Sequence, residues 1–148
     1  MCIRDSPKGV LIEHLGAINM ALSQISQFDI SEEDTCLQFA NYSFDAFVWE
    51  ILISIFSGAK LILLSKEILQ DSAKFIKLIT NTQISFATLP PYFLSNLQKA
   101  NLQAIHVLVT AGERPILRDV PKYLEAKRYF NAYGPVSYTH LRAHETLR

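Results

Sequence analysis

Residues 84–112, ISFATLPPYFLSNLQKANLQAIHVLVTAG, contain two short apolar runs separated by a helix-like segment. The runs at 84–87 and 106–110 have strand length and little internal polarity, which suits strands buried on both faces. Two prolines open the segment between them, and proline is well tolerated at a helix start. Its helically spaced apolar residues are Phe93, Leu94 and Leu97. A strand, a helix and a second strand in this order predict a parallel pair joined by a crossover helix.

The same alternation extends along the rest of the chain. Further strands are expected at 10–12, 36–40, 61–64 and 128–130. A first helix is expected where Ile18, Ala21, Leu22 and Ile25 share a face. A second is expected to begin at the N-cap Asp45 and to end at Gly58, and a third to begin at Asp71 or Ser72. The pattern at 116–123 predicts a further helix only weakly. The sequence therefore predicts an α/β fold with a mostly parallel sheet and crossover helices.

Composition excludes several classes of protein. The 148 residues carry 14 Lys and Arg against 14 Asp and Glu, so there is no basic surplus for nucleic acid or a membrane surface. With 49% hydrophobic and 19% charged residues, the chain has a globular composition. Its longest apolar stretch, 46–56, is broken by Glu50 and is too short to span a bilayer. Two cysteines make no disulfide framework, which favours the reducing cytoplasm.

The two ends of the chain differ from its middle. Residues 1–6, MCIRDS, and 136–148, VSYTHLRAHETLR, show neither periodicity nor caps and resemble translated sequencing-adapter sequence. We interpret both as non-native and 7–135 as the domain; the alternative is a pair of genuine irregular termini. His140 and His144 are therefore not taken as ligands, and no metal site is expected.

Small and polar residues follow the predicted strands. They occupy 41–45, 88–90, 111–113 and 131–135. Ligands bind beyond the carboxyl ends of the strands in open α/β sheets, so a site is expected at this edge. The chain has neither a GxxxxGK[ST] loop nor a GxGxxG motif, and nucleotide binding would need another device.

Four motifs carry a resemblance: PKGVLIEH at 7–14, NYSFDAFVWE at 41–50, TAGE at 110–113 and NAYGP at 131–135. The first resembles the end of the phosphate-binding signature of adenylate-forming enzymes. The second resembles a core motif of amino-acid adenylation domains in nonribosomal peptide synthetases, and the other two are similar to the motifs that follow it. All four occur in family order between 7 and 135.

The resemblance implies part of the large lobe of such a domain. In that family, ATP and an amino acid give an aminoacyl adenylate and pyrophosphate, with Mg²⁺. The phosphopantetheine thiol of a carrier domain, within neighbouring synthetase modules, then takes the acyl group. The implied roles are phosphate-loop catalysis by Lys8, nucleotide binding by Gly112, Glu113, Asn131, Tyr133 and Gly134, capture of the substrate ammonium by Asp45, and a side-chain pocket formed by Ala46, Trp49, Thr88, Val109, Ala111 and Ala132.

This pocket set is small, apolar and aromatic, so a bulky uncharged side chain such as phenylalanine is expected. The family's Ser/Thr/Gly-rich loop before Pro7, its Glu after Pro135 and its second lobe with the catalytic lysine are not in the sequence, so the chain alone is expected to be inactive.

Plainer interpretations stay open for the same residues. Asp45 suits a simple helix cap, 131–135 suits a strand exit, and the apolar pocket residues suit a core. The alternative functions are an acyl- or aryl-activating relative, which has no use for Asp45, and a non-catalytic α/β binding or scaffold domain.

Overall fold

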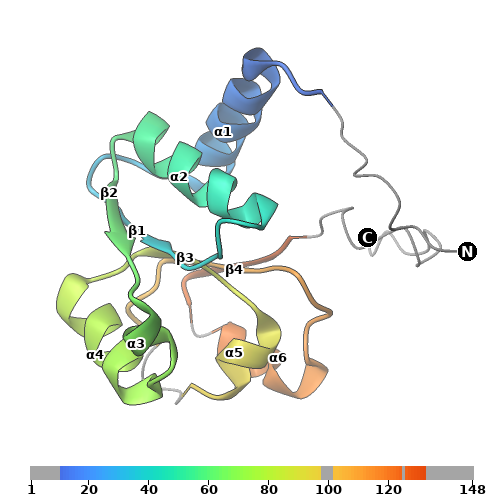
Figure 1. Ribbon diagram of the computed structural model, residues 1–148. Helices are drawn as coiled ribbons and strands as arrows, with labels where there is room; N and C mark the ends of the chain where they lie inside the picture. The colour runs from blue at the N-terminus through green and yellow to red at the C-terminus, as the bar shows by residue number, and fades with distance from the viewer. Residues whose placement is uncertain (1–10, 98–101, 125, 133–148) are drawn as a thin grey trace, which may run out of the picture.

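The structure, a computed structural model, describes residues 11–97, 102–124 and 126–132. Its five described strands form one sheet in the order β2-β1-β3-β4-β5, and every neighbouring pair is parallel (Figure 1). The strands are β1 Thr35–Gln38, β2 Lys60–Leu63, β3 Phe86–Leu89, β4 Val107–Thr110 and β5 Arg128–Asn131. The predicted parallel α/β architecture is confirmed.

The expected strand at 10–12 is wrong where the structure describes it. Leu11 and Ile12 belong to no strand, and Ile12 is 75% exposed. They lead directly into the first helix instead of lying beside another strand, so no ladder forms. Val10 and both ends interpreted as non-native, 1–6 and 136–148, lie outside the described residues. The other strands match their runs with boundary shifts of one or two residues.

Helices connect the strands and cover both faces of the sheet. They are α1 His14–Phe28, α2 Asp45–Ser57, α3 Lys66–Leu69, α4 Ser72–Thr82, α5 Pro91–Ser95 and α6 Val120–Tyr123, with a 3₁₀ turn η2 at Leu117–Asp119. Helices α1 and α2 lie on one face and α3 to α6 on the other (Figure 1). The short α3 has no counterpart in the expected elements. No helix in the described ranges is both long and apolar enough to cross a membrane.

Each face of the sheet has its own core. The core under α1 and α2 is aromatic, and the ring of Phe28 lies 5.6 Å from Phe86 and 6.2 Å from Trp49, centroid to centroid. The guanidinium of Arg128 donates to the carbonyls of Gln27 and Phe28, which ties the end of α1 to β5. The opposite core is larger and mainly aliphatic, with Phe75, Ile79, Leu94 and Leu108 fully buried. Leu22 of α1 was expected to share the inward face, yet it is 51% exposed.

The strand order reverses between β1 and β3. After β1 the chain crosses over one face through α2, and after β3 it crosses the other face through α5. The amino ends of these two strands are held together, because Thr35 donates its amide to the Ser85 hydroxyl at 3.0 Å and that hydroxyl donates to Asp34 at 2.6 Å. Their paired register covers only Cys36 and Phe86, whereas the other three strand pairs each register over four residues. The carboxyl ends of β1 and β3 are therefore the least tightly joined place in the sheet.

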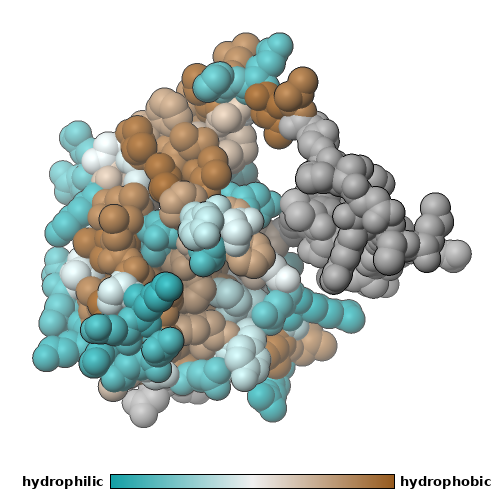
Figure 2. Space-filling view, in the orientation of Figure 1, coloured by the Kyte–Doolittle hydropathy of each residue, from teal (hydrophilic) through white to brown (hydrophobic). Residues whose placement is uncertain are grey.

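Hydrophobic side chains also gather on the outside of the molecule. Figure 2 shows them over α2 and beside β2. The exposed members there include Val48, Ile55 and Phe56 of α2 and Leu63 of β2. The outer side of α2 and the β2 edge are therefore apolar surfaces in the described structure.

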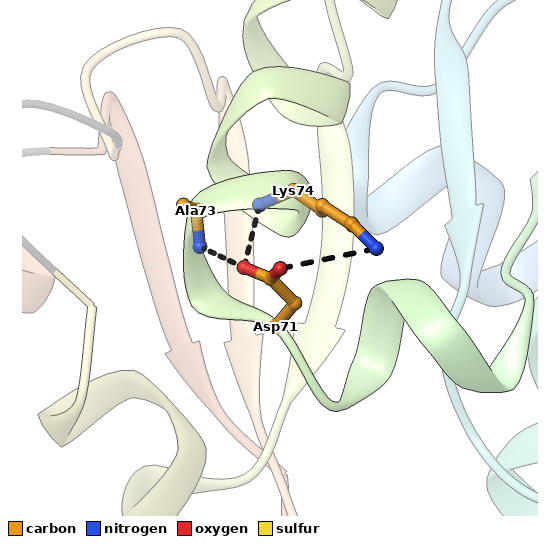
Figure 3. A network of polar contacts seen from close by, with 3 residues as sticks. All are labelled: Asp71, Ala73 and Lys74. Carbon is orange, nitrogen blue, oxygen red and sulfur yellow. Dashed lines mark hydrogen bonds and ion pairs between the residues drawn. The ribbon is translucent and has the colours of Figure 1, made fainter.

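Helix α4 begins at a strong cap. The Asp71 carboxylate accepts the backbone amides of Ala73 at 2.9 Å and Lys74 at 3.1 Å, and it lies 4.0 Å from the Lys74 ammonium (Figure 3). The expected helix start at Asp71 or Ser72 is confirmed. The cap satisfies two of the amides that a helix start leaves without partners.

We expect Asp71→Ala to lower the free energy of unfolding by about 1 kcal/mol, because two helix-end amides lose their acceptor. Lys74→Ala is the matched control. It removes only an exposed ion pair and should cost less than about 0.5 kcal/mol. Denaturant unfolding of the three proteins measures both changes, and equal losses in the two variants would contradict the capping role.

Candidate functional site

The candidate site lies at the carboxyl ends of β1, β3, β4 and β5. In an open parallel sheet, a crevice forms where the strand order reverses, since the two following helices leave on opposite faces. Here that place lies between the segment after Gln38 and the segment after Leu89. The expected substrate residues Asp45 and Thr88 come from these two neighbouring strand ends.

Asp45 does not cap α2 as the sequence predicts. The N-cap is Phe44, and Asp45 is the first helical residue. The turn before the helix explains the shift. The side-chain oxygen of Asn41 accepts the Ser43 amide at 3.0 Å, and the Phe44 amide donates to the Asn41 carbonyl at 2.9 Å. The turn spans residues 41–44, so Phe44 occupies the N-cap position and Asp45 follows as the first residue of the helix.

The Asp45 carboxylate is consequently an exposed anion in the first turn of α2. Its Oδ1 accepts the Ala46 amide at 2.8 Å, and its side chain lies at the strand-end edge rather than in the core. The positive end of the helix dipole stabilises a carboxylate at this position. Asp45 is thus free to contact a cation at the edge of the sheet.

Trp49 lies one helical turn after Asp45 and packs inward. Its ring centroid is 6.2 Å from that of Phe28 and 6.2 Å from that of Phe86, and its indole nitrogen is buried without a partner in the described structure. Ala46, between Asp45 and Trp49 in sequence, is half-buried. Trp49 therefore packs into the aromatic core one helical turn along α2 from the exposed Asp45.

The strand residues of the expected pocket share one face with Trp49. Thr88 and Val109 are register partners, and Val109 in turn is the partner of Phe130, two residues before Ala132. Alternation along the strands points these side chains toward α2. Val109 and Ala132 belong with Trp49 to the same packed cluster, whereas Thr88, Ala46 and Ala111 are not part of it. The Thr88 hydroxyl is buried and has no partner among the described residues.

The expected nucleotide residues lie at the ends of β4 and β5. Asn131 is exposed, and its side-chain oxygen accepts the Thr110 hydroxyl at 3.0 Å. The Tyr129 hydroxyl donates to the same Thr110 oxygen, 2.8 Å away. This chain of hydrogen bonds orients the Asn131 amide outward from the strand end.

Gly112 has φ +84°, a backbone conformation that favours glycine, and a Cβ there would meet nothing within 4 Å. The open space beside Gly112 and the amide of Asn131 suit a planar, hydrogen-bonding base. Glu113 is exposed, and Lys8, Tyr133 and Gly134 lie outside the described residues. The described residues contain no group of three or more His, Cys, Asp or Glu that could hold a metal.

Two polar side chains that the sequence interpretation did not assign stand out. One is Thr110, which is fully buried and orients Asn131. The other is Glu50, whose side chain is 1% exposed. A charged residue within an apolar helix already marked Glu50 in the sequence as unusual. The sequence did not show which residues it binds.

Glu50 binds the segment that leaves β1. Its Oε2 accepts the backbone amides of Phe39 and Ala40, each at 3.0 Å, and the side-chain amide of Gln38 at 3.3 Å. Its Oε1 is buried and has no hydrogen-bond partner among the described residues. Burial raises the pKa of the Glu50 carboxyl to about 7, although the three hydrogen bonds oppose the shift. The neighbouring Cys36 has a pKa raised to about 11 by burial, so it is not a reactive thiol.

Comparison with known proteins identifies the family. The model of the AMP-binding enzyme family matches residues 6–141. The chain belongs to this family. The chain is 36% identical over 129 residues to tyrocidine synthase 1 of Brevibacillus parabrevis and 36% identical over 134 residues to gramicidin S synthase 1 of Brevibacillus brevis. These matches cover 87% and 90% of the chain but only 12% of each relative.

Solved structures share the fold. The crystal structure of the nonribosomal peptide synthetase FmoA3 superposes with a TM-score of 0.73 at 20% identity, over 87% of this chain and 15% of that one. IdnL7 superposes with a TM-score of 0.71 at 23% identity, over 87% of this chain and 28% of that one. The chain therefore shares the fold of one part of these structures, and it spans a small part of its relatives.

The buried Glu50 should make stability depend on pH. Its folded pKa of about 7 lies above the ordinary value of 4.5, so the folded chain binds this proton more tightly than the unfolded chain. The stabilisation is complete below about pH 4.5 and is lost as pH rises to about 7, with an upper bound of about 3 kcal/mol. Unfolding free energies measured across this range should fall with pH in the wild type relative to Glu50→Gln. Parallel curves for the two proteins would contradict a raised pKa.

Proposed function

We propose that the chain is part of an amino-acid adenylation domain that activates a bulky hydrophobic amino acid for nonribosomal peptide synthesis. The observation that carries the proposal is the exposed Asp45 at the start of α2, one helical turn before Trp49, which packs in one cluster with Val109 and Ala132. An anion followed by an apolar cluster at this strand-end edge supports a substrate with an ammonium group at one end and an apolar side chain at the other. Family membership and the synthetase relatives support the same reaction class.

In the proposed reaction, ATP supplies the activation: the amino-acid carboxylate displaces pyrophosphate from the α-phosphorus, and a carrier phosphopantetheine thiol later displaces AMP from the acyl group. The residues of this chain bind and orient. Asp45 holds the substrate ammonium through a charge-assisted hydrogen bond. Asn131 and the open backbone at Gly112 position the base. Catalysis of this kind depends on placing the two substrates in contact.

The proposal includes parts that the described residues do not contain. Lys8 is the catalytic residue of the phosphate loop, and Tyr133 and Gly134 complete the nucleotide site. Mg²⁺ is held by groups elsewhere in the parent protein, and carrier and neighbouring modules are its partners. The domain comprises 7–135, with 1–6 and 136–148 outside it. The free buried Cys36 is in keeping with a cytoplasmic, reducing location.

Two observations weigh against the alternatives. An acyl- or aryl-activating relative has no ammonium for Asp45, yet this carboxylate is exposed at the strand-end edge without an ion-pair partner in the described structure. A scaffold domain needs no hydrogen-bonded support for Asn131, yet Thr110 and Tyr129 provide one.

The central prediction concerns Asp45 and is measured in the parent protein. Asp45→Ala should cost about 2–5 kcal/mol in amino-acid-dependent pyrophosphate exchange, because the substrate ammonium loses its partner. Over a panel of amino acids, the wild type should prefer phenylalanine to glycine or aspartate, since burying a ring is favourable and a second carboxylate has no partner. Preference for a charged or very small substrate would refute the pocket. An Asp45→Ala protein with unchanged exchange would reduce Asp45 to a structural residue.

The 148-residue chain alone should show no amino-acid-dependent exchange of pyrophosphate into ATP. It covers only 12% of the length of the two synthetase relatives, so most of such a protein lies outside it. Exchange above the background of a heat-denatured sample would refute this expectation.

A further inference from the structure

The segment that carries Asp45 is fastened to α2 at both ends. One end is covalent, because Asp45 is the first residue of the helix. The other is Glu50, one and a half turns further along, whose Oε2 accepts the amides of Phe39 and Ala40 at 3.0 Å. The result is a closed loop of backbone, from 39 to 45, completed by one carboxylate.

The sheet supplies little restraint at this place. Strand β1 ends at Gln38, and its register with β3 covers only Cys36 and Phe86. In a longer β1, the amides of Phe39 and Ala40 would donate to the neighbouring strand. Here they donate to the Glu50 side chain of α2 instead. Gln38 reinforces the link, because its side-chain amide donates both to Glu50 Oε2 at 3.3 Å and to the Ala40 carbonyl.

The interior of the loop is also fixed. Asn41 accepts the Ser43 amide and hydroxyl at 3.0 and 2.9 Å, and its carbonyl accepts the Phe44 amide at 2.9 Å. These hydrogen bonds hold the turn between its two anchors.

We infer that Glu50 is a positioning residue of the amino-acid site, which holds the 39–44 segment against α2 and so sets the place of the Asp45 carboxylate. The inference rests on the proposed function of Asp45. Glu50 itself touches no substrate, since its carboxylate is buried beneath the segment that it binds. Burial of an acidic group opposes its ionisation, and one Glu50 oxygen stays without a partner among the described residues.

Three substitutions of Glu50 in the parent adenylation domain separate the effects of its side-chain length, its charge and its volume. Glu50→Leu removes the acceptor at similar volume. Glu50→Asp keeps the carboxylate but shortens the side chain by one methylene, which moves the acceptor away from the two amides. It tests the inference even where Glu50→Leu does not fold. Glu50→Gln keeps a carbonyl oxygen in reach of both amides and is the conservative rescue.

The measurement is the KM for the amino acid and the KM for ATP in pyrophosphate exchange. We expect Glu50→Leu and Glu50→Asp to raise the amino-acid KM by about tenfold or more, the effect of losing one well-formed hydrogen bond at the site. Glu50→Gln should stay within about threefold of the wild type, and the ATP KM should change less than about twofold in all three, since the nucleotide residues lie on other strands.

Asp71→Ala is the matched control for lost stability. Its cap lies on α4, which packs on the opposite face of the sheet from α2 (Figure 1), so it should lower stability without altering either KM. An unchanged amino-acid KM in Glu50→Asp, or equal rises in both KM values, would overturn the inference and leave Glu50 with a structural role.

Asp45→Ala separates this outcome from failure of the proposed function. If Asp45→Ala raises the amino-acid KM and the Glu50 variants do not, only the positioning role is lost. If Asp45→Ala leaves the amino-acid KM unchanged, the proposed function of Asp45 fails, and the positioning role fails with it.

Discussion

Parallel strands cannot be joined by tight turns, so each strand in this sheet must be followed by a crossover that covers one face or the other. The chain uses both faces, and the change from one to the other occurs between β1 and β3. Two consequences follow from that single reversal. The backbone segments after these strands leave on opposite faces of the sheet, and a crevice is the usual result at the strand ends between them. The candidate site owes its location to this reversal more than to any individual residue.

Much of this architecture could be predicted from the sequence because the central strands are buried on both faces and appear as uninterrupted apolar runs. The order of the strands in the sheet could not be predicted from the sequence. The strands and helices alternate along the chain in the same way whether the next strand pairs with one side of β1 or with the other. The run at 10–12 shows the limit of the pattern: three apolar residues predict a strand only when a neighbouring strand is available to pair with them. The boundary of α2 shows another limit: Asp45 has a strong capping preference, yet the turn at Asn41 precedes a helix whose N-cap is Phe44.

The candidate site was predictable mainly from its motifs. The resemblance to adenylation domains implied Thr88, Val109 and Ala132, whose shared face follows only from the strand register, and helical spacing puts Trp49 one turn after Asp45. The supporting groups were not predictable in the same way. Thr110 and Glu50 act through hydrogen bonds to residues 21 and 10 or 11 positions away in the chain, and those distances have no periodic signature. A charge inside an apolar helix indicates that a buried partner exists, but the fold must be known before the partner can be named.

The outer strands β2 and β5 each have one neighbour in the described sheet. Among the described residues no strand pairs with their outer sides, and on β2 the side chain of Leu63 is exposed. A strand edge of this kind is a template for another strand. The sheet is therefore extensible: strands can be added at either side without disturbing the reversal between β1 and β3, where the candidate site lies. The same property has a cost for the isolated chain, because two copies can satisfy these edges by pairing with each other.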